Sequence, residues 1–178
     1  MLRNAMTLAL ALSALGFLGL APLAAEAGSA KVERGKYLVN LGGCTDCHTS
    51  GYFFGKPDMT RYLGGSDVGF QMPGLGVFYA PNLTPDKETG LGNWSAKEIK
   101  TAFQTGVRPD GRILAPIMPW PALAGLSDED ADAIVAYLQS LPPVKNKVSG
   151  PFGVGEQPSS FVMMIVPGAQ GVAPPAPQ

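Results

Sequence analysis

The chain has 178 residues, of which 46% are hydrophobic, and its formal net charge is −1. This length allows one domain of ordinary size with additional segments. The near-neutral charge and the lack of a basic run exclude a nucleic-acid binder of the electrostatic type. The 23 glycines and 17 prolines predict long irregular connections rather than a dense set of helices.

The first 27 residues have the pattern of an export signal. Arg3 gives a positive start, residues 8–23 form an uncharged and mostly apolar run, and Ala25-Glu26-Ala27 fits the small-x-small cleavage pattern. The alternative is an uncleaved membrane anchor, but the run is near the lower limit for spanning a bilayer and Pro22 interrupts its end. Cleavage is the favoured prediction, and export would place the chain in the periplasm.

Three segments have helical patterns. Residues 31–41 are expected to form a short amphipathic helix. A capping box at Ser95-Ala96-Lys97-Glu98 begins a second helix, which ends near Gly106. A third helix begins at Ser127 with an acidic first turn and ends at Pro142-Pro143. The sequence therefore predicts three main helices joined by long loops.

Two further segments fit no helix. Residues 49–80, rich in glycine and aromatic residues, are either a surface loop folded over its own aromatic cluster or a flap or docking surface, and the sequence leaves both open. Residues 147–178 form a Pro/Gly-rich extension that is expected to be disordered from residue 167. Its apolar hexamer, residues 161–166, is expected to pack on the domain rather than to contact a partner, because an exposed apolar hexamer invites aggregation.

All cysteines and the single histidine lie in one pentapeptide, Cys44-Thr45-Asp46-Cys47-His48. A C-x-x-C-H motif is the attachment site of a c-type haem, with both thiols bound to one edge of the porphyrin and the adjacent imidazole on the iron. A zinc site would need more Cys or His ligands, and a thioredoxin-like dithiol would lie in a βαβ pattern that is missing around residue 44. The sequence therefore predicts one covalent haem c on Cys44, Cys47 and His48.

The second axial ligand of the iron is expected to be a methionine thioether, since the chain has no other histidine. Met118 is the best candidate. It lies between the second and third helices, in a loop that Pro116 and Pro119 stiffen. Two alternatives are that Met118 only fills the core, or that Met72 is the ligand.

These motifs resemble those of single-haem class I c-type cytochromes, specifically the cytochrome subunits of bacterial periplasmic or membrane-bound dehydrogenases. The resemblance covers about residues 33–146 and implies an all-α fold around one haem. Besides the haem motif, the matching segments are Arg34-Gly35-Lys36-Tyr37-Leu38, Ala80-Pro81-Asn82-Leu83-Thr84-Pro85-Asp86, Gly92-Asn93-Trp94-Ser95, Pro109-Asp110-Gly111-Arg112, Met118-Pro119 and Ala136-Tyr137-Leu138-Gln139-Ser140-Leu141-Pro142-Pro143.

The resemblance also implies roles for single residues. The carbonyl of Pro81 should accept a hydrogen bond from His48 Nδ1 and so fix the ring. Gly35 and Tyr137 should mark the crossing of the first and last helices. Further residues are expected to pack on the haem or to reach a propionate, namely Leu83 for packing and Trp94 or Arg112 for the propionate.

One departure from compact class I cytochromes is the position of the Pro-Asn-Leu segment. It begins 33 residues after His48 (81 − 48), because residues 49–80 intervene. The domain is therefore expected to span residues 28–146 with an insertion at 49–80. A long connection at this place also occurs in the subfamily that the chain resembles.

The predicted function is one-electron transfer without catalysis, because two filled axial positions leave no open site for a substrate. The expected electron donor is a dehydrogenase and the expected acceptor is another cytochrome or an oxidase of a respiratory chain. An uncleaved N-terminus or a partner subunit would tie the chain to a membrane. The alternative function is a haem enzyme or gas sensor with an open sixth coordination position.

Overall fold

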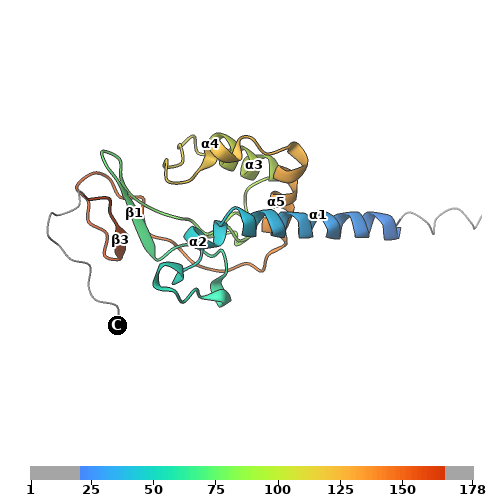
Figure 1. Ribbon diagram of the computed structural model, residues 1–178, viewed down its shortest axis with the longest axis horizontal. Coiled ribbons are helices and arrows are strands. Elements are labelled where there is room, and N and C mark those ends of the chain that lie inside the picture. The colour runs from blue at the N-terminus through green and yellow to red at the C-terminus, as the bar shows by residue number, and fades with distance from the viewer. Residues whose placement is uncertain (1–20, 167–178) are drawn as a thin grey trace, which may run out of the picture.

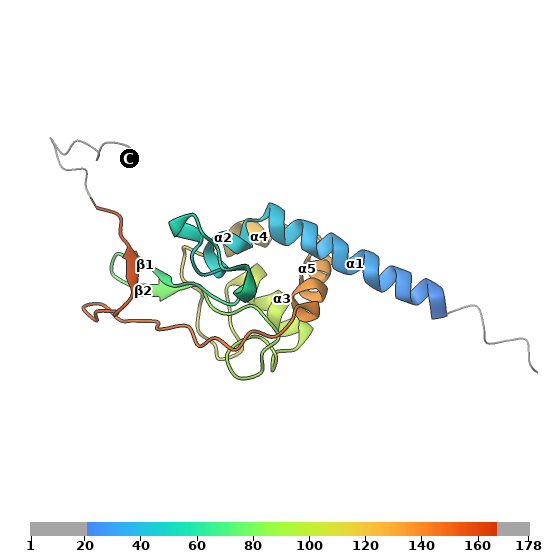
Figure 2. The same ribbon diagram turned by 90° about the horizontal axis from the view of Figure 1, so that it is seen from below.

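The computed structural model describes residues 21–166 and contains mainly helices with few strands (Figures 1 and 2). Most of the predicted export signal and the end of the predicted extension lie outside the described residues. The elements in chain order are α1 (Ala21–Leu41), α2 (Cys44–His48), the 3-10 turns η1 (Tyr52–Phe54) and η2 (Met59–Arg61), β1 (Val68–Met72), β2 (Gly76–Tyr79), α3 (Ala96–Thr105), α4 (Trp120–Leu123), α5 (Asp128–Ser140) and β3 (Phe161–Met163).

Helices α1 and α5 cross at Gly35 (Figures 1 and 2). A Cβ atom at Gly35 would collide with the carbonyl oxygen of Ala133 and lie 2.8 Å from Tyr137 Cβ. Beside the crossing, the Arg34 guanidinium donates to both carboxylate oxygens of Asp130, at 2.8 and 3.1 Å. The expected crossing at Gly35 and Tyr137 is confirmed.

The core lies between α1, α3 and α5. Helix α3 begins with the predicted capping box, in which Ser95 N donates to Glu98 Oε2 at 2.7 Å and Glu98 N donates to Ser95 Oγ at 3.2 Å. The apolar faces of the helices meet in one cluster of buried side chains. Its members are Val39, Leu63, Ile99, Phe103, Ala131, Ile134, Val135, Tyr137 and Leu138.

The first helix begins earlier than the sequence pattern predicts. The amphipathic pattern suggested a start near Lys31, but α1 is already helical at Ala21, so this predicted boundary is wrong. Residues 26–31 are exposed, so tertiary packing does not explain their conformation. The segment 21–30 contains five alanines, and alanine has the highest intrinsic helix propensity.

No helix within residues 21–166 is both long enough and apolar enough to cross a membrane.

The expectation of an all-α fold misses a small sheet formed by the insertion and the extension. Strand β1 pairs antiparallel with β2 and parallel with β3, in the order β2-β1-β3. The parallel register places Val68 opposite Phe161, and the Tyr79 hydroxyl donates to the Phe161 carbonyl at 3.2 Å. The expected packing of the hexamer 161–166 holds only for the backbone of β3 and for half-buried Val162. The other five side chains of the hexamer are exposed, so for them the prediction is wrong. Pairing between β1 and the distant β3 leaves no local sequence pattern, which is why β3 was missed.

The aromatic side chains of the insertion contact one another. The ring of Phe53 meets those of Tyr52 and Phe70 edge-on, with centroids 5.5 Å apart in both pairs. The ring of Phe54 meets Phe161 of the extension at 4.8 Å. The insertion therefore folds over its own aromatic cluster, as one of the two interpretations of residues 49–80 requires.

The close crossing of α1 and α5 predicts a large effect of one methyl group. Gly35→Ala is expected to lower the free energy of unfolding by about 1–3 kcal/mol, because the added Cβ forces two packed helices apart. Gly28→Ala in the same helix is the matched control, since a Cβ there meets nothing within 4 Å. Chemical unfolding followed by circular dichroism measures both. Equal unfolding free energies for the two variants would contradict the close crossing.

Candidate haem site

The C-x-x-C-H pentapeptide forms the short helix α2, which follows Gly43 in a left-handed conformation with φ of 63°. Helical geometry brings positions i, i+3 and i+4 to one face, so Cys44, Cys47 and His48 share a side of this turn. Both cysteines are free thiols. Burial raises the pKa of the Cys44 thiol to about 11 and also raises the pKa of Cys47. Both thiols are therefore protonated at neutral pH.

His48 is buried, with 5% of its surface exposed, and its Nδ1 lies 2.7 Å from the carbonyl oxygen of Pro81. A carbonyl oxygen only accepts hydrogen bonds, so the proton resides on Nδ1. Burial lowers the pKa of His48, and the bond to Pro81 offsets only part of that effect. The ring is neutral at pH 7, and the lone pair on Nε2 is available to a metal.

Met118 lies in a constrained loop just before α4. Its backbone N–H donates to Ala115 O at 2.9 Å, and its carbonyl accepts from Trp120 N at 2.8 Å. The Trp120 ring lies over Gly106 at the end of α3, where a Cβ would be 2.7–2.9 Å from ring atoms. Met118 itself is half-buried and packs against the core cluster. The loop is therefore fixed directly beside the methionine.

A group of two arginines and a tryptophan lies on the turn that follows α3. The Arg108 guanidinium is 4.9 Å from the centroid of the Trp94 ring, and Arg108 N donates to Arg112 O at 3.0 Å. Partial desolvation by the surrounding protein and the nearby charge of Arg108 lower the pKa of the Arg112 guanidinium. Asp110 pairs with Arg108 at 3.4 Å, so one positive charge of the turn is uncompensated.

Arg108 was not among the residues that the sequence indicated. A sequence signal for it existed, because Arg108 directly precedes the turn-forming residues Pro109-Asp110-Gly111 and so lies opposite Arg112 when the chain folds back. In the structure a bridge between Val107 and Ile113 closes this turn. A turn closed in this way brings both guanidinium groups to one side of the domain.

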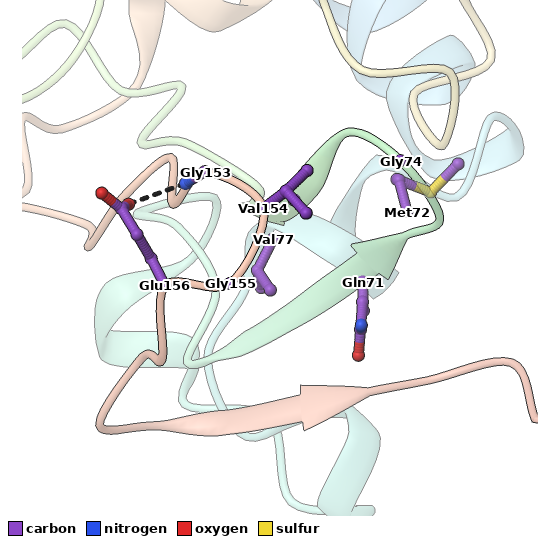
Figure 3. Close-up of a pocket in the computed structure, with 9 residues that line it drawn as sticks. Gln71, Met72, Gly74, Val77, Gly153, Val154, Gly155 and Glu156 are labelled. Atoms are coloured by element: carbon purple, nitrogen blue, oxygen red, sulfur yellow. Dashed lines mark hydrogen bonds between the residues drawn. The ribbon is translucent and has the colours of Figure 1, made fainter.

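The predicted site residues lie in different surroundings. Pro81 contacts buried His48, Cys47 is half-buried on α2, and Arg112 is exposed. Four others pack as half-buried side chains against the core cluster, namely Cys44, Leu83, Trp94 and Met118. Met72, the alternative ligand, lies elsewhere. It ends β1 and lines a small hollow together with Gln71 and the segment Gly153–Glu156 (Figure 3). Glycines and polar side chains make up much of this hollow, in which Glu156 Oε2 accepts from Gly153 N at 2.7 Å.

Comparison with known proteins agrees with this geometry. Residues 32–142 match the cytochrome c family. The chain belongs to the cytochrome c family. The C-x-x-C-H pentapeptide and its Pro81 contact both lie inside the matched range, and membership of this family implies a covalent haem c.

Three relatives of this cytochrome c are subunits of dehydrogenases. The cytochrome c subunit of alcohol dehydrogenase (quinone) from Gluconobacter oxydans is 35% identical over 155 residues, which cover 82% of the chain and 30% of the relative. The gluconate 2-dehydrogenase cytochrome c subunit of Pantoea cypripedii is 39% identical, with coverages of 73% and 27%. The fructose dehydrogenase cytochrome subunit of Gluconobacter japonicus is 32% identical, with coverages of 75% and 27%. The chain therefore spans less than a third of these relatives.

The residues of this cytochrome c fit a covalently bound haem. Helix α2 offers two free thiols and an imidazole with one available nitrogen, and the carbonyl of Pro81 holds the other nitrogen. Apolar side chains at the margin of the core, including Leu83 and Met118, are only half-buried in the protein alone. Such surfaces suit the flat apolar face of a porphyrin.

The packing of Trp120 on Gly106 gives a prediction for the Met118 loop. Gly106→Ala is expected to lower the free energy of unfolding by about 1–3 kcal/mol more than Gly111→Ala. Both glycines have positive φ, 75° and 79°, so both variants have the same backbone cost, but only Gly106 faces a ring. Chemical unfolding of the two variants measures the difference, and equal values would show that Trp120 does not rest on Gly106.

Proposed function

We propose that this cytochrome c is a one-electron carrier that binds a single haem through Cys44, Cys47 and His48. The observation behind this proposal is the 2.7 Å hydrogen bond from His48 Nδ1 to Pro81, which leaves a neutral imidazole with Nε2 free for iron. When bound, the haem supplies a reversible exchange of one electron between Fe(III) and Fe(II). The chain holds the group at one edge, and the fixed imidazole limits rearrangement as the charge of the iron changes.

Met118 is proposed as the second axial ligand. Its loop is held by Trp120 and Ala115, and it packs against the same core cluster as Cys44. The rival ligand, Met72, belongs to the sheet that the insertion and the extension form. A thioether ligand favours reduced iron and raises the potential. With both axial positions filled, the chain would have no site for a substrate on the iron.

Arg108, Arg112 and Trp94 are proposed to hold the haem propionates. Two guanidinium groups lie on one turn, and the Trp94 ring stacks beneath one of them. Guanidinium groups pair well with carboxylates, because their planar donors match two oxygens at once. Leu83 is proposed to pack on the porphyrin itself.

The names of the relatives support a role beside a dehydrogenase. All three are cytochrome subunits of dehydrogenases. We propose that the present chain accepts electrons from such a dehydrogenase, in which catalysis occurs, and passes them to another cytochrome or an oxidase. This role requires export, with residues 1–27 as the signal or as an anchor, residues 28–146 as the cytochrome domain and residues 147–178 as its extension.

The Met118 assignment predicts a spectral change. Oxidised cytochromes with His/Met ligation have a weak far-red absorption band from the iron–sulfur bond. The haem-loaded wild type and Met72→Ala are expected to show this band, and Met118→Ala is expected to lose it. Absorption spectra of the oxidised and reduced proteins make the measurement.

Two other outcomes would change the assignment. Loss of the band in Met72→Ala but not in Met118→Ala would make Met72 the ligand. A wild type without the band, whose reduced form binds carbon monoxide readily, would have an open sixth position. The protein would then be a haem enzyme or gas sensor rather than an electron carrier.

The propionate assignment predicts a change of reduction potential. Arg108→Gln is expected to lower the midpoint potential by ~40 mV, which corresponds to about 1 kcal/mol for one lost charge near the haem. The sign follows because a nearby positive charge disfavours Fe(III). Arg61→Gln is the control, since Arg61 is exposed and pairs with Asp58. Equal potentials for both variants, measured by redox titration, would argue against a propionate at Arg108.

A further inference from the structure

Residues 144–148, which we call the strap, follow α5 after Leu141-Pro142-Pro143 and lie beyond the residues that match the cytochrome c family. In both views the chain after α5 runs back along the body of the domain towards the sheet (Figures 1 and 2). The strap contacts two separate segments, residues 82–84 and residues 64–65. The first segment directly follows Pro81, which bonds the His48 ring, and the second bonds the His48 backbone.

The first segment supports the imidazole of His48. Asn82 directly follows Pro81, whose carbonyl accepts from His48 Nδ1. Asn82 Nδ2 donates to Val144 O at 2.6 Å, and Val144 N donates to Thr84 Oγ1 at 3.0 Å. The Thr84 hydroxyl in turn donates to Asn82 Oδ1 at 2.7 Å. Asn82 and Thr84 are 1% and 0% exposed, so water cannot replace these bonds.

The second segment supports the backbone of His48. Gly65 N donates to the His48 carbonyl at 2.8 Å, and Asn146 Nδ2 donates to the carbonyl of the preceding Gly64 at 2.8 Å. Side chains of the strap also pack against both glycines. A Cβ on Gly64 would be 2.9 Å from Val144 Cγ1, and a Cβ on Gly65 would collide with Val148 Cγ2.

We propose that the strap positions His48, holding both the Pro81 carbonyl and the His48 backbone in place and thereby setting the potential of the iron. This proposal rests on the proposed haem site. The strap has two independent attachments. One leads through Asn82 and Pro81 to the ring of His48, and the other leads through Gly64 and Gly65 to its backbone carbonyl. Fully satisfied buried hydrogen-bond networks of this kind rigidify the groups that they join. The hydrogen bond at Nδ1 makes the imidazole a stronger donor to a metal.

The most direct test follows the Nδ1 proton of His48 in the reduced, haem-loaded full chain. His48 is the single histidine, so a protein labelled with ¹⁵N-histidine gives one ring Nδ1–H signal in the NMR spectrum. Thr84→Val removes the hydroxyl that joins Val144 to Asn82. It is expected to speed exchange of the Nδ1 proton with deuterated solvent by about tenfold, because buried partners lose their bonds. Thr84→Ser keeps the hydroxyl and is expected to exchange within about twofold of wild type.

Asn146→Ala isolates the strap from the direct Thr84–Asn82 contact. It removes the bond to Gly64 and leaves the Thr84 hydroxyl intact, and Asn146 is only half-buried, so the variant is expected to fold. Exchange is expected to be about threefold faster than in wild type, the effect of one lost hydrogen bond. Ser160→Ala is the matched control, because it removes another side-chain bond of the chain that follows α5, to Asp67 O, and lies outside the strap.

The midpoint potential gives a second readout. A weaker hydrogen bond at His48 Nδ1 makes the imidazole a weaker electron donor to Fe(III). Thr84→Val and Asn146→Ala are therefore expected to raise the midpoint potential, by ~30 mV for a threefold change in the redox equilibrium. Wild-type exchange and potential in Asn146→Ala would overturn the proposal, even if Thr84→Val differs, since the effect would then be local to Asn82. A wild type that attaches no haem would instead refute the proposed function.

Discussion

The hydrogen bond between His48 and Pro81 joins two parts of the chain that are 33 residues apart, and much of the domain is arranged to preserve it. The intervening insertion leaves and returns through backbone bonds beside the histidine. Gly65 N donates to His48 O, and Leu83 N donates to Leu63 O at 2.9 Å. The base of the insertion is therefore part of the histidine site. The outer part can extend into a hairpin without moving the imidazole.

The parts of the fold that the sequence predicts well are those with local signals. The capping box of Ser95 and Glu98 predicts the start of α3, and the serine before the acidic turn predicts the start of α5. Gly35 is a different case, because a glycine inside a helix has no single meaning. The resemblance to known cytochromes supplied its role, and the approach of Ala133 and Tyr137 supplies the physical reason.

Features that depend on distant residues were missed or left open. Strand β3 pairs with β1 across more than 90 residues of chain, since Val68 lies opposite Phe161. Hydrophobic periodicity cannot reveal such a partner, because it describes one segment at a time. Arg108 was missed for a similar reason, since its position against the Trp94 ring follows from how the turn folds back. The second axial ligand also depends on tertiary geometry, and its assignment to Met118 stays a prediction.

The insertion and the extension, which are separate in the sequence, form one structural unit. The insertion alone would expose one edge of β1, and unpaired strand edges favour aggregation. The extension covers this edge with β3, while Phe152 pairs with Val77 on β2 and its ring lies 6.1 Å from that of Tyr79. The chain between α5 and β3 is therefore fixed at both ends, by the last helix and by the sheet. Because both ends of this segment are fixed, the strap stays in contact with Gly64, Gly65 and Asn82. The sheet, although it lies apart from helix α2, thus helps to keep the strap in the place where it contacts the segments around His48.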